Sequence, residues 1–305
     1  MTHPFATAAY AAGLAHVGDA LAVPEWNGHV LTRPTPCGTR RDAMGPYPLT
    51  PFSPAADLAG GLARLKAAGL VSVVLVLDDH LRPPTEALTV AFATARPFKT
   101  HQVYDRAFGP PAYDKHHRYE IRRANTRVEV REIALADHLP VWEALYGDLI
   151  TRHGLTGLHA FPHAHHAALA ALPGIRTFGA FVEGALVSAH IFATHDGHAV
   201  SHLAASSPDG YRNGAAYAVN ALAIEALTDC GTINFGGGAG SGDDPADGLV
   251  RFKKGFSNRI APSWICGAVL DPDAYRALSA DLGDNGFFPA YRGAAKLERS
   301  DEHQG

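Results

Sequence analysis

Residues 177–216 carry the strongest structural signal in the chain and read TFGAFVEGALVSAHIFATHDGHAVSHLAASSPDGYRNGAA. Three mainly apolar runs, 177–182, 185–194 and 198–204, are separated by the dipeptides Glu-Gly and Asp-Gly. A glycine in such a dipeptide reaches positive φ at no steric cost, so each dipeptide forms a two-residue hairpin turn. We therefore predict an antiparallel meander of three strands.

The end of this stretch, 206–216, leaves the last strand and enters a helix that we expect over 214–228. A helix N-terminus presents unpaired backbone N–H groups, and here three small residues and the adjacent Arg212 would let an anion approach closely. One interpretation is a cradle for a phosphate or carboxylate. The other is that the small residues only allow the helix to pack tightly against the sheet.

Helical and strand patterns alternate along the rest of the chain. Asp137 is expected to cap a helix whose apolar residues recur at helical spacing over 139–149. A β-branched run at 71–77 is typical of a buried strand, and repeated prolines keep 33–54 in extended or turn conformations. This mixture predicts an α+β protein, and 305 residues leave room for two domains.

The overall charge argues against a protein that binds polyanions with its whole surface, but one segment is strongly basic. The chain has 26 Lys plus Arg against 30 Asp plus Glu, a formal net charge of −4, so we expect no DNA partner. Segment 115–131 holds six basic side chains against Glu120 and Glu129. It would contact a polyphosphate or a nucleic acid, or it is a solvated helix and linker, as charge runs usually are.

Three cysteines without a Cys-x-x-Cys pair argue against a disulfide framework and fit a reducing, cytoplasmic setting. The longest strongly apolar stretch, 70–77, is far below the ~20 residues that span a bilayer, so we expect no membrane partner. Four histidines lie within 159–166, but Pro162 interrupts them and no acidic residue stands at ligand spacing. We therefore predict no metal site.

Four features together resemble the GNAT acyltransferase superfamily, and within it the Fem-type aminoacyl-tRNA-dependent peptidyl transferases and their acyltransferase relatives. They are the meander, the helix entry RNGAA at 212–216, the stretch GTINFGG at 231–237 and the run LVRFKKGF at 249–256. The resemblance covers residues 115–270, and FFPAYR at 287–292 is also similar to that group.

Members of this group carry two GNAT-like domains in tandem, each a mixed central sheet flanked by helices. The resemblance therefore implies a mixed α/β fold with a diverged, acceptor-side N-terminal domain over 1–114. A C-terminal domain over 115–305 would hold the donor site. The loop GPYPL at 45–49 resembles the acceptor-side loop of the group, which assigns acceptor binding to Tyr47, together with Arg251.

The resemblance leaves two acyl donors open. Acetyl-CoA-dependent GNAT members place Gln or Arg three residues before a glycine of the pyrophosphate site; here Tyr211 takes that position, while Gly214 and Ala216 match. In Fem-type members the Phe-Lys pair of a Phe-Lys-x-Gly-Phe motif lies at the aminoacyl transfer site, and Phe252 and Lys253 match it. We therefore favour aminoacyl-tRNA over acyl-CoA as co-substrate, with no tightly bound cofactor. The expected donor-binding residues are Tyr211, Arg212, Asn213, Gly214, Ala215, Ala216, Arg122, Arg123 and Lys254.

An amine that attacks an ester or thioester carbonyl needs orientation, loss of a proton and stabilisation of the oxyanion, but no covalent nucleophile. By the resemblance, Lys253 supplies positive charge near the oxyanion with Phe252 beside it, and Lys254 takes this part if the register differs. His202, near the end of the meander, is a candidate to accept the amine proton, directly or through water. The alternatives are a solvated charge pair at a strand end and a histidine packed between strands.

The sequence thus predicts an amide-forming acyltransferase of biosynthesis, which transfers an aminoacyl group from aminoacyl-tRNA to an amine of a small metabolite such as a natural-product intermediate. Sustained charged heptads, which would indicate the helical arm of cell-wall members, do not occur, and this favours a small acceptor. The alternatives are an acyl-CoA-dependent N-acyltransferase and a non-catalytic GNAT-like module that binds tRNA or a nucleotide metabolite. The glycine-rich run 236–242 would be a lid or a connector. The oligomeric state is left open.

Overall fold

In the computed structural model the chain folds as two compact units, and each unit is assembled from two separate segments. Unit 1 comprises Met1–Pro4 and Lys99–Pro262, and unit 2 comprises Phe5–Phe98 and Ser263–Gly305. The structure describes residues 2–53, 55–111, 113–239, 247–280, 282 and 286–293.

This division differs from the boundary at residues 114 and 115 that the sequence led us to expect. Strand β5 (Thr94–Asp105) runs from unit 2 into unit 1, and β11 (Arg259–Val269) runs back. The second half of β11 pairs antiparallel with β4 (Ser72–Leu77), which places the C-terminal segment in the unit of the N-terminal strands. Pairing between strands so far apart in sequence leaves no trace in local composition, so a boundary read from composition misses it.

The sheet of unit 1 has the strand order β5-β10-β9-β8-β7-β6. Its strands β7, β8 and β9 form the predicted antiparallel meander, which is confirmed. The turn residues Glu183 and Asp196 adopt φ of 50° and 51°, and the glycine after each has φ of 81° and 74°, as a type I′ hairpin requires. The remaining strands are β6 (Glu129–Ile133), β7 (Ile175–Val182), β8 (Ala185–His195), β9 (His198–Ser206) and β10 (Thr232–Asn234).

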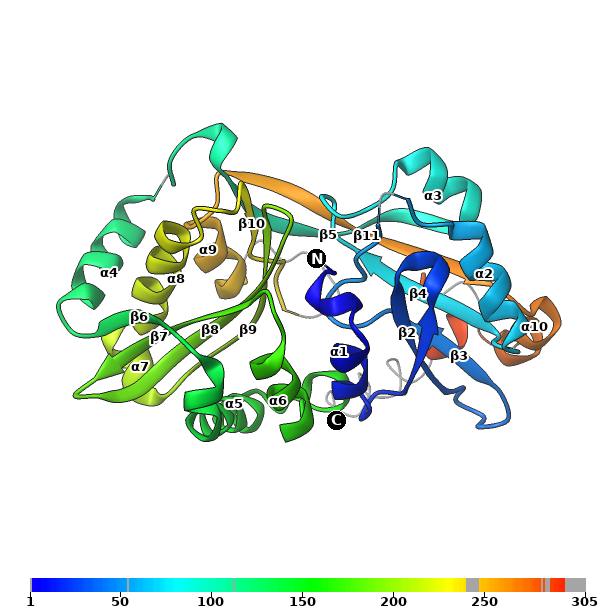
Figure 1. The fold of residues 1–305 in the computed structure, drawn as a ribbon, viewed down its shortest axis with the longest axis horizontal. Helices are drawn as coiled ribbons and strands as arrows, with labels where there is room; N and C mark the ends of the chain where they lie inside the picture. Colours follow the sequence, from blue (N-terminus) through cyan, green and yellow to red (C-terminus); the bar gives the residue numbers. More distant parts are fainter. Residues whose placement is uncertain are drawn as a thin grey trace. The chain divides into compact units, whose positions relative to one another are not determined.

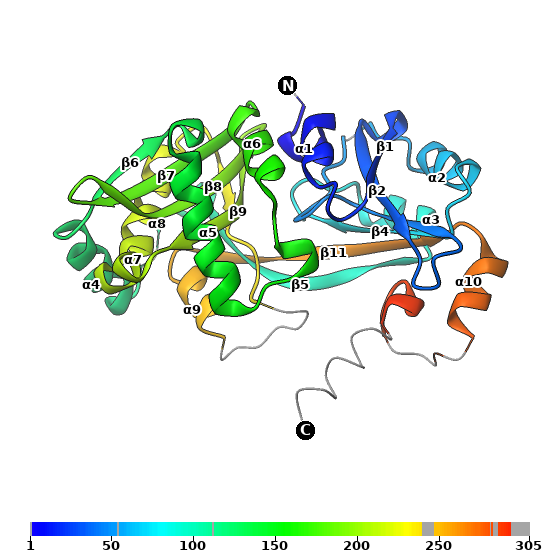
Figure 2. The same ribbon diagram turned by 90° about the horizontal axis from the view of Figure 1, so that it is seen from below.

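Helices cover both faces of this sheet (Figure 1). On one face lie α4 (Lys115–Asn125) and α8 (Ala215–Ala226), and on the other lie α5 (Leu139–His153) and α6 (His163–Ala171). Figure 2, a view turned by 90°, shows α5 packed against the strands of this sheet. Between α8 and the strands lies an apolar core, in which each large side chain contributes roughly 1.5–3 kcal/mol through burial. Its largest fully buried side chains are Phe178, Phe192, Phe235 and Phe256.

The helix predicted over 214–228 is found as α8, and a further short helix, α7 (Pro208–Asn213), precedes it and is separated from it by Gly214, which adopts a left-handed φ of 69°. One expected cap in unit 1 is corrected by the structure. The N-cap of α5 is His138, because Asp137 lies one residue earlier in a short 3₁₀ turn. Turn chemistry sets such boundaries, and spacing of apolar residues does not resolve it.

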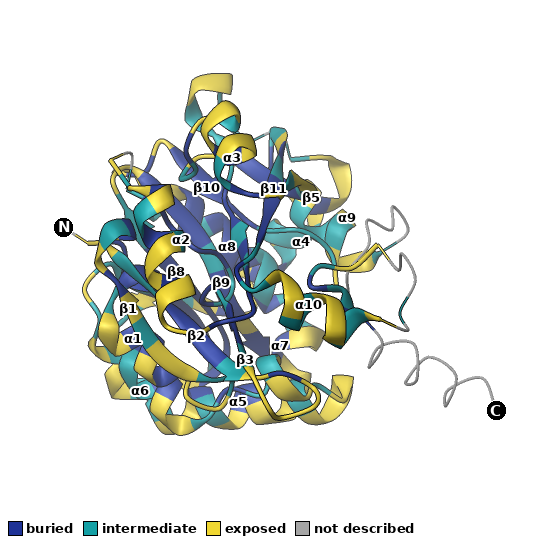
Figure 3. Cartoon of the chain, turned by 90° about the vertical axis from the view of Figure 1, so that its right-hand side faces the viewer, coloured by how far each residue is buried: buried dark blue, intermediate teal, exposed yellow. Residues whose placement is uncertain are grey.

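The sheet of unit 2 has the order β1-β2-β3-β4-β11, with β3 and β4 parallel and the other neighbours antiparallel. The segment 33–54, expected as loop and turn, contains β3, because its backbone pairs with β2 on one side and β4 on the other. The core under α2 is apolar, and Figure 3 shows buried strands beneath helices with exposed outer faces. The elements are β1 (Asp19–Val23), β2 (Gly28–Pro34), β3 (Arg41–Met44), α1 (Ala8–Gly13), α2 (Leu58–Ala67), α3 (Thr85–Ala91) and α10 (Pro272–Ser279). Each unit is therefore a mixed sheet flanked by helices, and the predicted α+β class is confirmed.

Buried Asp42 explains the FFPAYR motif near the C-terminus. The Asp42 carboxylate accepts hydrogen bonds from Arg292 Nε (2.6 Å) and Nη2 (2.8 Å), from Arg33 Nε (3.1 Å) and from the Tyr291 hydroxyl (3.0 Å). Ser72 Oγ lies 2.7 Å from the same hydroxyl. This network ties residues 291 and 292 to the sheet of unit 2, so the motif has a structural role.

We predict that Asp42→Ala lowers the free energy of unfolding by about 3 kcal/mol, because it leaves two guanidinium groups without their shared carboxylate. Both arginines keep 22% of their side chains exposed, which moderates the cost. Urea unfolding followed by circular dichroism measures the change. The matched control is Asp19→Ala, since Asp19 pairs with Arg41 but keeps 81% of its side chain exposed, and we expect less than about 1 kcal/mol there. Equal effects of the two substitutions would mean that the buried carboxylate stabilises the fold no more than an exposed ion pair does.

Candidate active site

Strands β9 and β10 are parallel neighbours that separate after three residue pairs, the last at Asn234. Beyond Asn234 the chain stays with β5, through backbone hydrogen bonds of 2.9 and 3.0 Å between Gln102 and the next two residues. Strand β9 continues to Ser206. In the described ladder, residues 201–206 thus lack a β10 partner, and an unpaired strand edge offers backbone donors and acceptors to a ligand.

His202 lies in this part of β9, at an irregularity of the strand. On β8, Ile191 pairs with Leu203 and Phe192 pairs with Ser201, so His202 is a bulged residue. Its Nε2 lies 3.2 Å from Nε2 of His165 on α6. Burial, and then the neighbouring His165, hold the pKa of His202 well below 6.5, so the ring is neutral at physiological pH.

Lys253 lies on helix α9 (Gly248–Lys254) and not at a strand end, as the sequence had suggested. Asp247 caps this helix and accepts the Leu249 N–H at 2.7 Å. From the last turn, Lys253 Nζ donates to the Gly237 carbonyl at 2.7 Å, in the loop that follows β10. Burial, and then the charge of Lys99, lower the pKa of Lys253 to about 8.

His190 of β8 connects Lys253 and His202. It is buried, with Nε2 at 2.7 Å from Ser201 Oγ and Nδ1 at 3.1 Å from Asn220 Oδ1. Burial, and then the positive charge of Lys253, lower the pKa of His190 to about 3. His190 in turn contributes to lowering the pKa of His202. Lys253 and His202, two of the three predicted catalytic residues, thus both lie in unit 1, and His190 interacts electrostatically with each of them.

Phe252, the third, has a packing role. Its ring lies 4.9 Å from that of Tyr217 and 5.2 Å from that of Phe256, and its carbonyl lies 3.0 Å from His117 Nε2. A Cβ on Gly255 would come within 2.0 Å of the His117 ring, so a glycine is needed where α4 meets α9. Phe252 thus anchors the helix that presents Lys253.

Arg251 and Lys254 stand on the exposed side of α9, away from the loop that Lys253 contacts. Of the two adjacent lysines, Lys253 is the one that contacts the loop, whereas Lys254 is exposed, and the role of each stays a prediction. Nothing brings Arg251 to the polar group of Lys253, His190 and His202, and its part in acceptor binding stays a prediction.

The segment expected to cradle a phosphate is already hydrogen-bonded to itself. Ser207 caps α7, the N–H of Tyr211 donates to the Ser207 carbonyl at 3.0 Å, and the N–H of Gly214 donates to the Tyr211 carbonyl at 3.1 Å. Arg212 pairs with Asp209 one turn earlier, and Asn213 Nδ2 donates to the Asp209 carbonyl. These groups form one turn of helix and not an open loop.

A carboxylate occupies the start of α8, which begins at Ala215 and Ala216. A Cβ on Gly214 would lie 3.4 Å from Glu120 Oε2 of α4. Arg123 holds that carboxylate by hydrogen bonds of 2.6 and 2.9 Å and also donates to the Arg212 carbonyl at 2.9 Å. A negative charge at a helix N-terminus is favourable, but this one disfavours a phosphate at the same place. A carboxylate therefore stands close to Gly214, one of the residues expected to form the pyrophosphate cradle.

The outer face of α4 keeps the basic character of segment 115–131. Arg122 and Arg118 are exposed, and Tyr119 between them keeps 57% of its surface exposed. Arg152 of α5 lies over the ring of exposed Tyr211, with its guanidinium carbon 4.6 Å from the ring centroid. Arginine and aromatic groups on one unit suit phosphates and unstacked bases.

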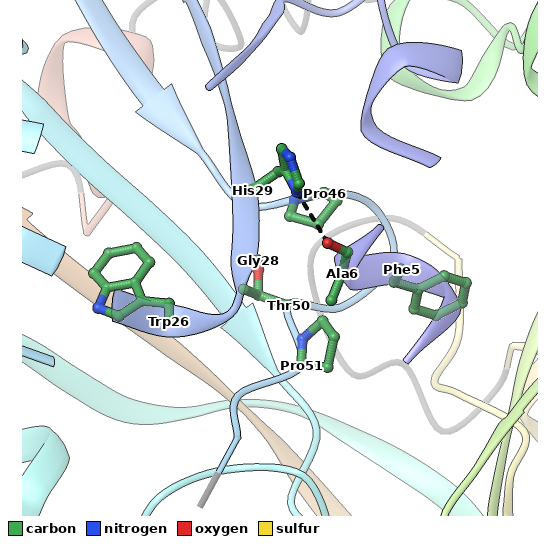
Figure 4. A pocket seen from close by; sticks show the side chains of 8 residues that line it. All are labelled: Phe5, Ala6, Trp26, Gly28, His29, Pro46, Thr50 and Pro51. Atoms are coloured by element: carbon green, nitrogen blue, oxygen red, sulfur yellow. Dashed lines mark hydrogen bonds between the residues drawn. The ribbon is translucent and has the colours of Figure 1, made fainter. Parts of the chain in front are cut away.

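Tyr47 belongs to unit 2, where its carbonyl accepts a hydrogen bond from the Tyr10 hydroxyl. Burial raises the pKa of Tyr47 above 10.0. Pro46 and Thr50, on either side of it in the sequence, line a small pocket. Figure 4 shows this pocket with the His29 ring bonded to the Ala6 carbonyl at 2.9 Å. The loop predicted to face the acceptor thus borders a pocket of its own unit.

The remaining features of the sequence are the histidine cluster, the glycine-rich run and the apolar stretches. Among the described residues, no group of three or more His, Cys, Asp or Glu could hold a metal ion. His163 and His166 lie near Glu143, with Nδ1 to Oε1 distances of 2.7 and 3.6 Å. In the glycine-rich run, residues 240–242 lie outside the described residues. No helix in the described ranges is long and apolar enough to cross a membrane.

Sequence reasoning missed Lys99, His165 and His190. Lys99 is a single lysine on β5 outside any motif, and its Nζ donates to the Gly238 carbonyl at 2.8 Å. His165 and His190 are two of 18 histidines, so residue type alone did not distinguish them. Their importance comes from strand pairing and helix packing, which place them beside Lys253 and His202.

Comparison with known proteins supports the fold. No protein-family model and no curated protein matches the sequence. The crystal structure of FemX superposes with a TM-score of 0.65 at 13% identity, covering 90% of this chain and 95% of FemX. The C-terminal domain of a protein described as a lysylphosphatidylglycerol synthetase, from Agrobacterium fabrum, gives 0.57 at 14% identity, covering 89% and 90% of the two chains.

A third similar structure is L-PGS from Bacillus licheniformis, with a TM-score of 0.52 at 12% identity, covering 85% of this chain and 90% of that one. The chain therefore shares the fold of FemX and of these two synthetase structures, in agreement with the Fem-like fold that the resemblance implied. At these identities the comparison concerns the fold, and the activity has to be argued from the site.

We predict that Lys253 in the native protein reacts with a small amine-acylating reagent with an apparent pKa of about 8. Burial and Lys99 disfavour its ammonium form, so a large neutral, nucleophilic fraction is present at mildly alkaline pH. The rate of modification of the Lys253 peptide against pH, followed by mass spectrometry, measures this value. In urea-unfolded protein the same lysine is expected to return towards 10.5. A native value as high as the unfolded one would contradict the described environment.

Proposed function

We propose that this protein is an amide-forming acyltransferase that moves an aminoacyl group from aminoacyl-tRNA to an amine of a small metabolite. The observation that carries the proposal is the inward ammonium of Lys253, held at 2.7 Å from the Gly237 carbonyl where β10 leaves β9. The fold shared with FemX supports the same class of reaction. The remaining steps follow from the chemistry that these residues can perform.

In the proposed reaction the acceptor amine attacks the ester carbonyl of the aminoacyl group. A carbon–nitrogen bond forms, the carbon–oxygen bond to the 3′-terminal ribose breaks, and the amine proton ends on the ribose oxygen. Negative charge develops on the carbonyl oxygen before the ester bond breaks, and a nearby ammonium in a partly desolvated site stabilises it. Lys253 supplies this charge, and no covalent nucleophile on the protein is needed.

His202 is the proton carrier in this proposal. Since burial holds its pKa well below 6.5, the ring is neutral at physiological pH and accepts a proton only transiently. Its hydrogen-bond distance of 3.2 Å to His165 makes the two rings one pair, in which one nitrogen donates and the other accepts. Transient acceptance fits a proton that passes on to the departing ribose oxygen.

The state of the α7 and α8 junction favours tRNA over CoA as the donor. The N–H groups of Tyr211 and Gly214 are hydrogen-bonded within the turn of α7, and Glu120 places a carboxylate near Gly214. The exposed arginines of α4 offer contacts to a nucleic-acid backbone instead. An acyl-CoA donor would have to bind without the phosphate cradle that is typical of acetyl-CoA-dependent relatives.

We predict that Lys253→Met lowers the rate of acceptor-dependent transfer by about 10²-fold or more, the scale of a lost oxyanion-stabilising group. The assay follows release of uncharged tRNA from purified charged tRNA in the presence of a panel of small amines. Lys66→Met is the matched control, because Lys66 is an exposed lysine in the last turn of α2 in unit 2 and should leave the rate unchanged. Unchanged turnover in Lys253→Met would remove this lysine from the mechanism.

The rate of transfer is expected to fall as pH rises through about 8, because Lys253 then loses its proton. Lys253→Arg keeps the positive charge at higher pH and should remove this descending limb. The measurement is the pH profile of the rate constant at saturating charged tRNA. If the rate of Lys253→Arg falls over the same pH range, the fall is due to another group, such as the ester substrate.

We predict that the protein binds charged tRNA in a salt-dependent manner and binds CoA weakly or not at all. Arg122→Glu should weaken tRNA binding and reduce the slope of log affinity against log salt by about 1. Titrations at several salt concentrations test both points, with Arg276→Glu as control because Arg276 is an exposed arginine of unit 2. Tight CoA binding with no tRNA binding would establish the acyl-CoA alternative. Binding of tRNA without transfer to any amine would support a binding module.

A further inference from the structure

An exposed arginine and an exposed tyrosine are stacked on each other in unit 1. The guanidinium carbon of Arg152, in the last turn of α5, lies 4.6 Å from the centroid of the Tyr211 ring of α7. Tyr211 keeps 54% of its surface exposed, and Arg152 is exposed as well. Aromatic rings and arginine guanidinium planes are the groups on which RNA-binding proteins stack unpaired bases.

The carboxylates of the two helices leave Arg152 to the tyrosine. Asp209 of α7 pairs with Arg212 of the same helix. Asp148 lies one turn before Arg152 on α5, but within the described ranges neither of these two residues is part of an ion pair. The Arg152 guanidinium therefore retains its charge and its donors for a ligand that lies on the tyrosine ring.

Helix α7 holds the tyrosine in a fixed position on the sheet. The N–H of Ser207 donates to the Val187 carbonyl of β8 at 2.9 Å, and Ser207 Oγ accepts the N–H of Gly210 at 3.1 Å. A Cβ on Gly210 would come within 2.3 Å of the Val187 carbonyl, so a glycine is needed where α7 lies against β8. The next residue, Tyr211, is thus presented outward on a backbone that is already ordered, which reduces the entropy lost on binding.

The pair lies at the edge of the sheet where the proposed reaction takes place. Strands β9 and β10 are parallel, so their carboxyl ends, at Ser206 and Asn234, lie at the same edge. Helix α7 follows β9, and the loop that contacts Lys253 follows β10. A nucleic-acid strand whose terminal ester lies at Lys253 can therefore extend along this edge to Tyr211.

Basic groups of α4 adjoin the same helix. Arg123 Nη2 donates to the Arg212 carbonyl at 2.9 Å, which joins the end of α4 to α7. The next residue of α4 towards its start, Arg122, is exposed. Stacking groups beside charges that contact the backbone are typical of proteins that bind single strands, whereas a duplex keeps its bases stacked on each other. The partner that fits this surface is therefore a short single-stranded RNA segment.

We propose that Tyr211 and Arg152 form a stacking platform for an unpaired nucleobase in the single-stranded 3′ end of the donor tRNA. The base lies flat on the exposed side of the pair, and Arg152 adds a charge that favours the neighbouring phosphates. The platform rests on the proposed function in one respect, that the RNA it binds is the acyl donor. Tyr211 then binds the donor through its ring, at a position where acetyl-CoA-dependent relatives have a pyrophosphate-site residue.

Binding of the tetranucleotide ACCA tests the platform without turnover. Its affinity for the 305-residue protein is measured by fluorescence anisotropy and compared with that of an abasic ribose-phosphate chain of the same length and charge. We expect the bases to raise the affinity by about 10-fold, which corresponds to about 1.4 kcal/mol of stacking.

Tyr211→Ala should weaken ACCA binding by about 10-fold and leave the affinity of the abasic chain unchanged. It should also leave the slope of log affinity against log salt unchanged, because no charge is lost. Tyr211→Trp should retain binding, since it keeps an aromatic surface. Arg152→Ala should weaken binding and reduce the salt slope, whereas Arg152→Lys should restore the slope but not the full affinity, because its ammonium does not stack.

Phe108→Ala is the matched control for the loss of an exposed aromatic ring. Phe108 belongs to unit 1 and keeps 67% of its surface exposed. It follows β5, which runs antiparallel to β10, so it lies at the opposite edge of the sheet from Tyr211. This substitution should leave ACCA binding unchanged.

Equal affinity for ACCA and the abasic chain would overturn the platform, and so would equal effects of Tyr211→Ala and Phe108→Ala. A loss of CoA binding in Tyr211→Ala, with ACCA binding unchanged, would assign the pair to the adenine of CoA and overturn its assignment to RNA. The thermal transition of each variant, measured alongside, shows whether it is folded.

The outcome of this experiment is separate from that of the proposed function, because the tetranucleotide carries no aminoacyl group. Base-dependent binding in a protein that transfers nothing leaves the platform standing and removes the proposed reaction. Transfer by a protein whose ACCA binding does not depend on Tyr211 leaves the reaction standing and removes the platform.

Discussion

The separation of β9 and β10 after Asn234 is the constraint on which the rest of unit 1 depends. Asn234 is buried, with its Nδ2 at 3.0 Å from His101 Nδ1 and its Oδ1 accepting the N–H of Gly236 at 2.7 Å. These bonds keep the chain on β5 and turn it into the glycine loop. The same turn leaves β9 without its neighbour from residue 201 onward and brings Gly237 under Lys253. The Asn234 side chain thus holds the chain at the point where β9 becomes unpaired and where the Gly237 carbonyl meets Lys253.

Helix α4 also positions parts of unit 1, through contacts near the start of α8 and with the chain around α9. Its Glu120 places a carboxylate near Gly214, and its His117 packs against Gly255 and hydrogen-bonds at the Phe252 carbonyl. The same helix leaves Arg122 exposed. A carboxylate near the start of α8 and arginines on the outer face of α4 are the physical basis of our proposal of a nucleic-acid donor.

The elements of the meander were predictable because their signal is local. Apolar runs and two glycine-containing turns define β7, β8 and β9 within one continuous stretch, Ile175 to Ser206. The site was only partly predictable. The Phe-Lys pair was found by its resemblance to a family motif, but its placement on a helix, with Phe252 packed and Lys253 turned to the loop, depends on the cap at Asp247 and the contact with α4. Lys99 and His190 carry no motif and could not be found by sequence pattern.

Local chemistry in the chain was sufficient for the strands of the meander, the hairpin turns and the basic character of segment 115–131, whereas Lys253 was found by its resemblance to a family motif. Each of these depends on residues close together in sequence, through side-chain period, glycine φ or charge count. The assembly of the two units, the closure of α7 by its own hydrogen bonds and the meeting of Lys99 with Lys253 were decided only in three dimensions. They depend on pairing between β4 and β11 and between β5 and β10, strands far apart in the chain, whose free energy comes from contacts that no short stretch of sequence contains.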